Sequence, residues 1–366
     1  MVKRRYISTR LLKPGMVIDQ ALIDRSKRIL IARKTTLDEF LINELGKMGV
    51  TGVYIREGEE DPEELQYEIS PQAQEVIEKL QVEDRTRVKL SESVKKRVSE
   101  GMQFLYSNTS DAAFVDTANN ISQELMKAIT ENDAVALNID ALKVSDEYTF
   151  KHSVDVATMA MIIARQNGME QQDVYQIGMA GLLHDVGKSQ IPNEILNKPG
   201  RLTEPEFEIM KQHSVFGYRI LQEKGGIPQQ VLMGVLQHHE KINGKGYPLG
   251  VKDKYIGPFA RILSVVDIYD ALVTERPYKK GFSQRDAVEM IMAMVEELDI
   301  NAMKGFLNSI ILYPVGSVIK LSNGERARVL QNIPGYPLRP KVVGIRNGKV
   351  YDLSGDVGCA SIIVES

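Results

Sequence analysis

The sequence predicts a mainly α-helical protein, with an all-α central core between a small α+β domain and a small β appendage. Apolar residues recur at helical spacing through residues 139–308, and Gly, Pro or capping residues punctuate the segments. After residue 312 apolar and polar residues alternate, with Asn-Gly turns at 323 and 347. A length of 366 residues suits two or three domains.

Residues 1–62 are predicted to form the small α+β domain. Strand-like runs occur at 16–23, 28–32 and 50–55, and turn residues separate them. The segment 37–48 has helical spacing and is closed by a glycine. A packing or dimerisation role is favoured over ligand sensing, because nothing in these residues specifies a ligand.

A helical connector is predicted for residues 63–138. An acidic segment with Gly and Pro, residues 57–65, leads into it and has the composition of a solvated linker. The charged run at 83–100 is typical of a solvated helix face. A homodimer through the N-terminal domain or this connector is left open.

Residues 139–308 are predicted to fold as a core of five to seven helices. Pro205 suits the first turn of a helix, Ser283 suits a helix cap, and Gly187 suits a helix end. The β appendage is assigned to residues 309–366 and given a structural role.

Composition excludes several partners and compartments. The net charge of −3 provides no overall attraction to a nucleic acid polymer or an anionic membrane. Cys359 is the only cysteine, which excludes an internal disulfide and fits a reducing compartment. No run of roughly 18 apolar residues and no signal peptide core is found, so a cytoplasmic location is expected.

The histidines gather in one part of the chain. All five lie between residues 152 and 239: His152, His184, His213, His238 and His239. Each falls on the apolar stripe of its segment, so the imidazoles are expected to point into a common interior. A lone inward histidine is more often a core residue with hydrogen-bond partners. Five of them with Asp185 and Asp267 favour a metal site, because burying so many imidazoles otherwise requires many partners.

The ordered set of motifs resembles one family. His184-Asp185 is followed by the segment HHEKINGKGYP at 238–248 and by Asp267. This pattern resembles the HD-GYP family, a branch of the HD-domain metal-dependent phosphohydrolases whose usual substrate is cyclic di-GMP. The resemblance implies an HD-type helical catalytic core. The N-terminal segment is also similar to the small domain often found ahead of HD-GYP domains.

The resemblance implies a set of metal ligands, with Asp185 as the bridge between two divalent transition-metal ions. Iron or manganese is expected first, and the ligand types also allow zinc. Some family members hold a third metal with a Glu where this chain has Tyr148, with Glu147 beside it. Two metal ions are therefore favoured over three. Glu240 and Asn243 are expected to orient the ligands. The implied ligands are His152, His184, Asp185, His213, His238, His239 and Asp267.

A second group of residues is predicted on the substrate side. Lys188 lies about one helical turn after His184 and is assigned a catalytic contact with the scissile phosphate. Arg276 and Lys279 match family positions that bind the phosphates and guanine. Tyr247 is predicted to stack on a base or to pack on the site wall, and Asp270 to face the substrate.

The expected reaction is hydrolysis of cyclic di-GMP to linear pGpG by a metal-bridging hydroxide, with further cleavage to GMP left open. One alternative is a catalytically idle receptor for cyclic di-GMP. The full ligand set favours an enzyme over this receptor. Another alternative is a hydrolase of a different cyclic dinucleotide, such as cyclic GMP-AMP, because the sequence does not rank guanine against adenine at one subsite.

Overall fold

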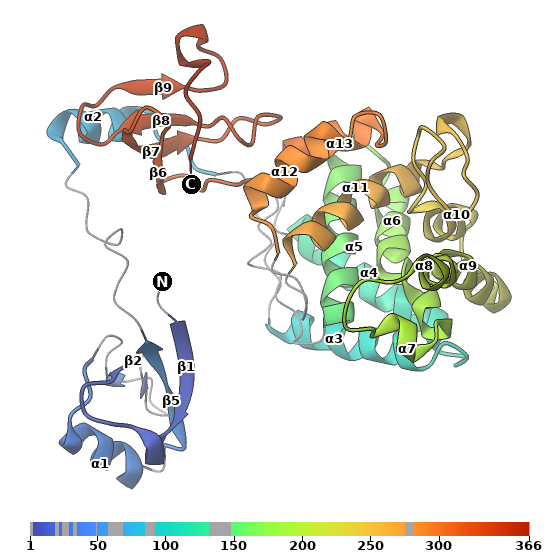
Figure 1. Cartoon of the computed structure of the whole chain (residues 1–366), viewed down its shortest axis with the longest axis horizontal. Helices are drawn as coiled ribbons and strands as arrows, with labels where there is room; N and C mark the ends of the chain where they lie inside the picture. The colour runs from blue at the N-terminus through green and yellow to red at the C-terminus, as the bar shows by residue number, and fades with distance from the viewer. Residues whose placement is uncertain are drawn as a thin grey trace. The chain divides into compact units, whose positions relative to one another are not determined.

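The computed structural model describes residues 3–18, 22–23, 29–31, 35–48, 50–57, 69–84, 92–131, 148–274 and 281–365. The chain divides into two compact units, residues 1–68 and 69–366 (Figure 1). In the described residues, the first unit combines short strands with an α-helix, whereas the second is mainly helical and includes a small sheet. The predicted fold class is confirmed.

The N-terminal unit contains a three-stranded antiparallel sheet in the order β1-β5-β2. Leu45 of its helix is buried against the sheet residues Ile18, Val53 and Ile55. The side chain of Asp38 caps this helix by accepting a hydrogen bond from the Leu41 amide. The strand β1 was not predicted. The elements are β1 (Lys3–Ser8), β2 (Val17–Ile18), the hairpin β3 (Leu22–Ile23) and β4 (Ile29–Ile31), α1 (Glu39–Lys47) and β5 (Gly52–Glu57).

The helices of the second unit are more numerous than predicted. Described residues of the central region form nine α-helices, α5 to α13, where five to seven were expected, because short helices flank the site. The elements are α3 (Glu92–Ser107), α4 (Phe114–Glu131), α5 (Tyr148–Gln166), α6 (Gln171–Leu183), the 3₁₀ helix η4 (Val186–Gln190), α7 (Asn193–Leu196), α8 (Glu204–Met210), α9 (His213–Lys224), α10 (Gln229–Gln237), α11 (Pro258–Val273), α12 (Gln284–Ala293) and α13 (Ile300–Ser309).

Helix α5 is the centre of the core. Every residue from His152 to Ala164 is buried. A helix without an exposed face must be covered on all sides, and α5 packs against α6, α11, α13 and α3. Figure 1 shows α5 and α6 side by side. Among the described residues, no helix combines the length and apolar content of a membrane span.

The predicted capping residues have mixed outcomes. Pro205 lies in the first turn of α8, and the Ser283 hydroxyl accepts a hydrogen bond from the Asp286 amide, as expected. Gly187 does not end a helix. It lies within η4, and a Cβ there would approach the His213 carbonyl oxygen to 1.9 Å. Glycine is required because η4 packs directly on the backbone of α9.

The C-terminal residues form a four-stranded antiparallel sheet in sequence order, β6 (Val318–Lys320), β7 (Arg326–Gln331), β8 (Lys341–Gly344) and β9 (Val350–Asp352). Gly324 and Gly348 have positive φ in its predicted Asn-Gly turns. Helix α2 (Pro71–Leu80) lies against this sheet although it is far away in sequence (Figure 1). Its Ala73 and Ile77 pack on Leu330 and Val343.

Candidate metal centre

The predicted metal ligands converge on one interior region. His152 lies inside α5, and Asp267 lies inside α11. The other ligands lie at helix ends, because His184 directly follows α6, His213 opens α9 and His238 directly follows α10. These three histidines are buried, and the chain turns away at each of these helix ends. The histidines therefore converge from separate elements.

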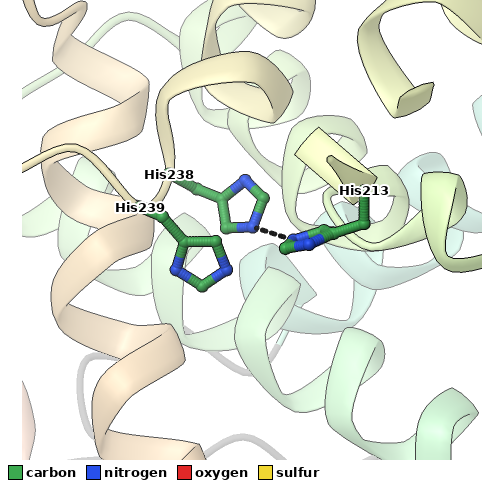
Figure 2. A group of neighbouring side chains, drawn as sticks. All are labelled: His213, His238 and His239. Atoms are coloured by element: carbon green, nitrogen blue, oxygen red, sulfur yellow. Dashed lines mark hydrogen bonds between the residues drawn. The ribbon is translucent and has the colours of Figure 1, made fainter. Parts of the chain in front are cut away.

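The ligand atoms form two groups. The first triad is His152, His184 and Asp185, and the second triad is His213, His238 and His239. Within each triad the candidate ligand atoms lie within 4.8 Å of one another. Figure 2 shows the second triad, in which three imidazoles from two parts of the chain face a common point. Each triad has the donor number and spacing that one metal ion requires.

Hydrogen bonds fix the tautomers of three histidines. The Nδ1 atoms of His184, His213 and His238 each lie 2.7 Å from a backbone carbonyl oxygen, those of Gly181, Met210 and Val235 respectively. A carbonyl oxygen only accepts, so each Nδ1 carries the proton. In the neutral imidazole, Nε2 then has only a lone pair, which is the state that a metal ion requires.

The second triad contains two such lone pairs in direct opposition. The Nε2 atoms of His213 and His238 lie 3.2 Å apart (Figure 2). Burial lowers the pKa of both side chains, so both are neutral and neither Nε2 donates to the other. Opposed lone pairs repel each other unless a cation lies against them. The donor set therefore fits a metal ion.

Two carboxylates, Asp185 of the first triad and Asp267, each approach histidines of both triads. One Asp185 oxygen, Oδ1, is 3.5 Å from His213 Nε2, and the other is 3.4 Å from His184 Nε2. Asp267 likewise has Oδ1 3.2 Å from His152 Nε2 and Oδ2 3.7 Å from His239 Nδ1. Oδ1 of Asp185 is buried without a hydrogen-bond partner in the described part of the chain. Such an oxygen needs a cation to offset its lost hydration.

The carboxylates determine the charge of the first triad. Burial alone would lower the pKa of His152, but Asp267 and Asp270 outweigh it and raise the pKa well above the usual value. Burial would raise the pKa of Asp185, but the charge of Lys188, with electrostatic and hydrogen-bond contributions from His184, outweighs it and holds the pKa well below the usual value. Asp185 is therefore ionised and ready to bind a cation.

The second triad has the opposite electrostatics. Burial is the main cause that lowers the pKa of His213 and His238 and lowers the pKa of His239 to about 3. Neighbouring imidazoles lower these values further. Three neutral imidazoles stand ready at physiological pH, and a metal ion would bind without displacing protons from them.

Asp270 lies behind the site and does not face the substrate, which corrects the prediction for this residue. Its side chain is 0 % exposed, and its Oδ2 accepts a hydrogen bond of 2.6 Å from His152 Nδ1. Thr274 Oγ1 donates to the same oxygen. A carboxylate in this position orients the imidazole and strengthens its Nε2 as a ligand.

Asp155 was missed by sequence analysis. It lies one turn after His152 on α5, is fully buried, and neither carboxylate oxygen has a hydrogen-bond partner within the described residues. Burial and the charge of Asp270 raise its pKa well above the usual value. The spacing of three residues from His152 was the available signal, because it places both side chains on one helix face.

The loop after His239 folds back on the site. The Tyr247 amide donates to the His239 carbonyl, and a Cβ at Gly246 would meet the Lys241 nitrogen at 2.4 Å. Glycine is required there because two backbone segments touch. Glu240 accepts hydrogen bonds from the amides of residues 249, 250 and 251. Glu240 therefore anchors this loop. Among the described residues, its side chain makes no hydrogen bond to a predicted metal ligand.

The substrate-side predictions are placed in part. Lys188 Nζ lies 2.5 Å from Asp185 Oδ2, and the Tyr247 ring lies 4.6 Å from the His239 ring. Arg276 and Lys279 lie outside the described residues. Tyr148 is the first residue of α5.

Comparisons with known proteins agree with this geometry. Residues 136–301 match the family model of the HD domain. Cyclic di-GMP phosphodiesterase PA4108 of Pseudomonas aeruginosa is 36% identical over 230 residues, which cover 62% of this chain and 56% of that protein. Cyclic di-GMP phosphodiesterase of Thermotoga maritima is 39% identical over 165 residues, which cover 44% and 45%.

A third relative has a different substrate in its name. The 3'3'-cGAMP-specific phosphodiesterase 3 of Vibrio cholerae is 37% identical over 150 residues, which cover 41% of this chain and 32% of that protein. The chain spans about half the length of the first two relatives, 56% and 45%. The matched region contains both triads and the Gly-Tyr-Pro loop. Residues 136–301 of this chain therefore match the HD domain, and they contain the motif set that resembles its HD-GYP branch.

Proposed function

We propose that this protein is a metal-dependent phosphodiesterase that opens cyclic di-GMP to linear pGpG. The main support for this proposal is that the Nε2 lone pairs of His213 and His238 oppose each other, with the two atoms 3.2 Å apart. The Asp185 carboxylate lies beside them and approaches histidines of both triads. This arrangement of buried donors supports a centre that holds cations. The cyclic di-GMP phosphodiesterases among its relatives support the choice of reaction.

The chain supplies the positions for two divalent cations. When bound, two such ions polarise a phosphate oxygen and lower the pKa of water from 15.7 toward about 7, which provides a nucleophile at neutral pH. Asp185 and Asp267 carry two negative charges between the triads, only half of what offsets two divalent cations. The loaded centre therefore stays positive and attracts an anionic phosphodiester.

Iron or manganese is the proposed metal. Imidazole ligands suit iron and carboxylate ligands suit manganese, whereas thiolate ligands select softer metal centres. The described residues provide two triads, which supports two ions.

Four residues are proposed on the substrate side. The Lys188 ammonium lies next to Asp185, which supports a contact with the scissile phosphate in which its charge would stabilise the transition state. Tyr247 lies over His239 and is proposed to contact a base. Arg276 and Lys279 are proposed to bind the phosphates and guanine on the family pattern alone. Self-association through residues 1–62 or 63–138 also stays a prediction, which light scattering of the full chain would test.

The test uses anaerobically purified protein loaded with Fe(II) or Mn(II). Elemental analysis should give two metal ions per chain, and chromatography should show conversion of cyclic di-GMP to pGpG. Asp185→Asn should lower activity by more than roughly 100-fold. Losses of up to that size are typical of residues that only orient metal ligands, and Asp185 is itself a proposed ligand. Binding of cyclic di-GMP without turnover in the loaded wild type would instead favour a receptor.

A second candidate substrate is 3'3'-cyclic GMP-AMP, which the Vibrio cholerae relative's name supports. Both substrates present the same phosphodiester to the metal centre and differ in one base. A competition assay with equal concentrations of the two dinucleotides would rank them. Preference for cyclic GMP-AMP would keep the reaction and change the substrate.

A further inference from the structure

A row of aromatic rings leads away from the metal centre. The Tyr247 ring lies 4.6 Å from the His239 ring, and the Phe207 ring lies 6.2 Å from Tyr247 at an angle of 81°. Phe207 is 45% exposed. Single exposed apolar side chains are common on protein surfaces, but this one continues an aromatic row that starts at a metal-ligand candidate. An exposed ring in that position is available to a bound molecule.

Phe207 is held firmly. Its helix, α8, begins with a capping box between Thr203 and Glu206, and Lys198 Nζ lies 2.5 Å from Glu206. The same helix ends at Met210, whose carbonyl accepts the Nδ1 proton of His213. The element that orients a metal-ligand candidate therefore also fixes Phe207. A ring fixed in advance loses little conformational entropy when a flat ligand stacks on it.

A cation lies beside this aromatic pair. Lys211 Nζ is 5.5 Å from the centre of the Phe207 ring and 5.8 Å from that of Tyr247. The ammonium is also paired with Glu208 at 2.5 Å, which keeps it near the rings. Lysine donates well to the adjacent O6 and N7 acceptors of guanine, whereas adenine presents an amino group in place of O6.

We propose that Phe207 and Tyr247 form an aromatic platform for one purine base of a cyclic dinucleotide, with the base stacked on the Phe207 ring and the perpendicular Tyr247 ring beside it, and that Lys211 selects guanine at that base. The inference rests on the proposed function and deepens it, because it assigns base recognition to α8. The aromatic row begins 4.6 Å from the His239 ring, so a base on this row would lie next to the metal centre. Stacking accepts either purine, so the choice of base falls to Lys211.

Phe207→Ala tests the platform. Loss of base stacking should raise KM for cyclic di-GMP by about tenfold and leave kcat within about twofold. Phe207→Trp should restore KM, since a larger ring stacks at least as well. Ile209→Ala is the matched control, because Ile209 is 41% exposed on the same helix, and it should leave both constants unchanged. Metal content should equal that of wild type in all three variants.

Lys211→Met tests the choice of base. The ratio of kcat/KM for cyclic di-GMP to that for cyclic di-AMP should fall by about tenfold, the loss expected for one base-edge contact. Lys349→Met is the control, because Lys349 also lies over a ring, that of Tyr351 at 5.1 Å, but in the C-terminal sheet. It should leave the ratio unchanged.

Four results would overturn the inference. KM unchanged in Phe207→Ala would remove the platform, and a fall in kcat with lost metal, without rescue by tryptophan, would show a structural role only. An unchanged base ratio in Lys211→Met would remove the selection of guanine. Wild-type protein with two metals and no turnover of any cyclic dinucleotide would remove the proposed function together with the inference.

Discussion

The two triads of the metal centre are built in different ways. The first triad lies deep against α5 and α11, with Asp267, Asp270 and Asp155 around His152. The second triad consists of neutral imidazoles at helix ends, and its His239 side chain is 24% exposed next to the Tyr247 loop. The first triad is therefore surrounded by buried carboxylates, and the second is the more exposed side, from which the proposed anionic substrate would approach.

This difference follows from where the ligands sit on their helices. A residue inside a buried helix, such as His152, can be supported by carboxylates on the neighbouring helix. A residue at a helix end instead uses the free carbonyl of the preceding turn, as His213 and His238 do with Met210 and Val235. The carboxylates raise the pKa of His152, whereas burial lowers the pKa of His213 and His238 and keeps them neutral.

Asp270→Ala should break the first triad while the second stays intact. Without this carboxylate His152 loses its hydrogen bond of 2.6 Å and the charge that raises its pKa. Metal affinity or activity should fall by about 10–100-fold, the range for residues behind metal ligands. Metal titration followed by elemental analysis should show one weakened site of two.

Thr274→Val is the matched control for this prediction. It removes the hydroxyl that donates to Asp270 at 3.2 Å but leaves the bond to His152 in place. Its metal content and activity should stay within about twofold of wild type, because a neutral hydrogen bond contributes only about 1 kcal/mol. Equal losses at both sites in Asp270→Ala would mean that the two triads are not independent.

Gly187→Ala should disturb the second triad through its backbone. A Cβ there would lie 1.9 Å from the His213 carbonyl oxygen and 2.4 Å from the Gly217 nitrogen, so η4 and α9 must separate. Overpacking of this kind costs about 1–3 kcal/mol. Chemical unfolding should show the loss of stability, and metal titration should show a weakened second site.

Gly178→Ala is the corresponding control in α6. There the added Cβ meets only side-chain atoms of Met161, at 2.5 Å and beyond, and a methionine can change its rotamer. It should cost less stability than Gly187→Ala and should leave both metal sites filled. Equal destabilisation of the two variants would contradict the backbone contact as the cause.

The fold was predictable where the pattern was local. Helical spacing located the ligand-bearing helices, and Asn-Gly located the turns that Gly324 and Gly348 form with positive φ. The strand β1 was missed because its pairing partner, β5, lies more than forty residues away. The packing of Ala73 and Ile77 on the C-terminal sheet joins segments from opposite ends of the second unit, and no local pattern records such a contact.

The site was predictable as a set of ligands but not as an arrangement. Histidine spacing and the aspartates predicted which residues converge, since a ligand must be His, Asp or a similar donor. Asp270 and Asp155 have roles that depend on α5 facing α11, which the sequence does not state. Phe207 and Lys211 occupy an ordinary helical pattern, so only their distance to Tyr247 distinguishes them.

The smallest expected effect concerns Asp155, behind the first triad. Burial and the charge of Asp270 raise its pKa well above 3.8, the usual value. Between these two values the unfolded chain releases a proton that the folded chain keeps, so stability falls as pH rises. The asparagine side chain in Asp155→Asn does not titrate, so this loss of stability with rising pH is absent in the variant. The metal-free variant should therefore be more stable than wild type by roughly 1 kcal/mol at pH 8, the order of cost of a buried unsatisfied group.

Thermal unfolding at two pH values distinguishes this charge effect from packing. Near pH 3.5 Asp155 is largely protonated in both states, so the gain of Asp155→Asn should shrink toward zero. Asp116→Asn, on the exposed first turn of α4, should give no gain at either pH. A gain of equal size at pH 3.5 and pH 8 would assign the effect to packing. A loss of stability at both pH values would mean that the Asp155 side chain has a favourable partner. The repulsion between Asp155 and Asp270 would then be weaker than their burial indicates.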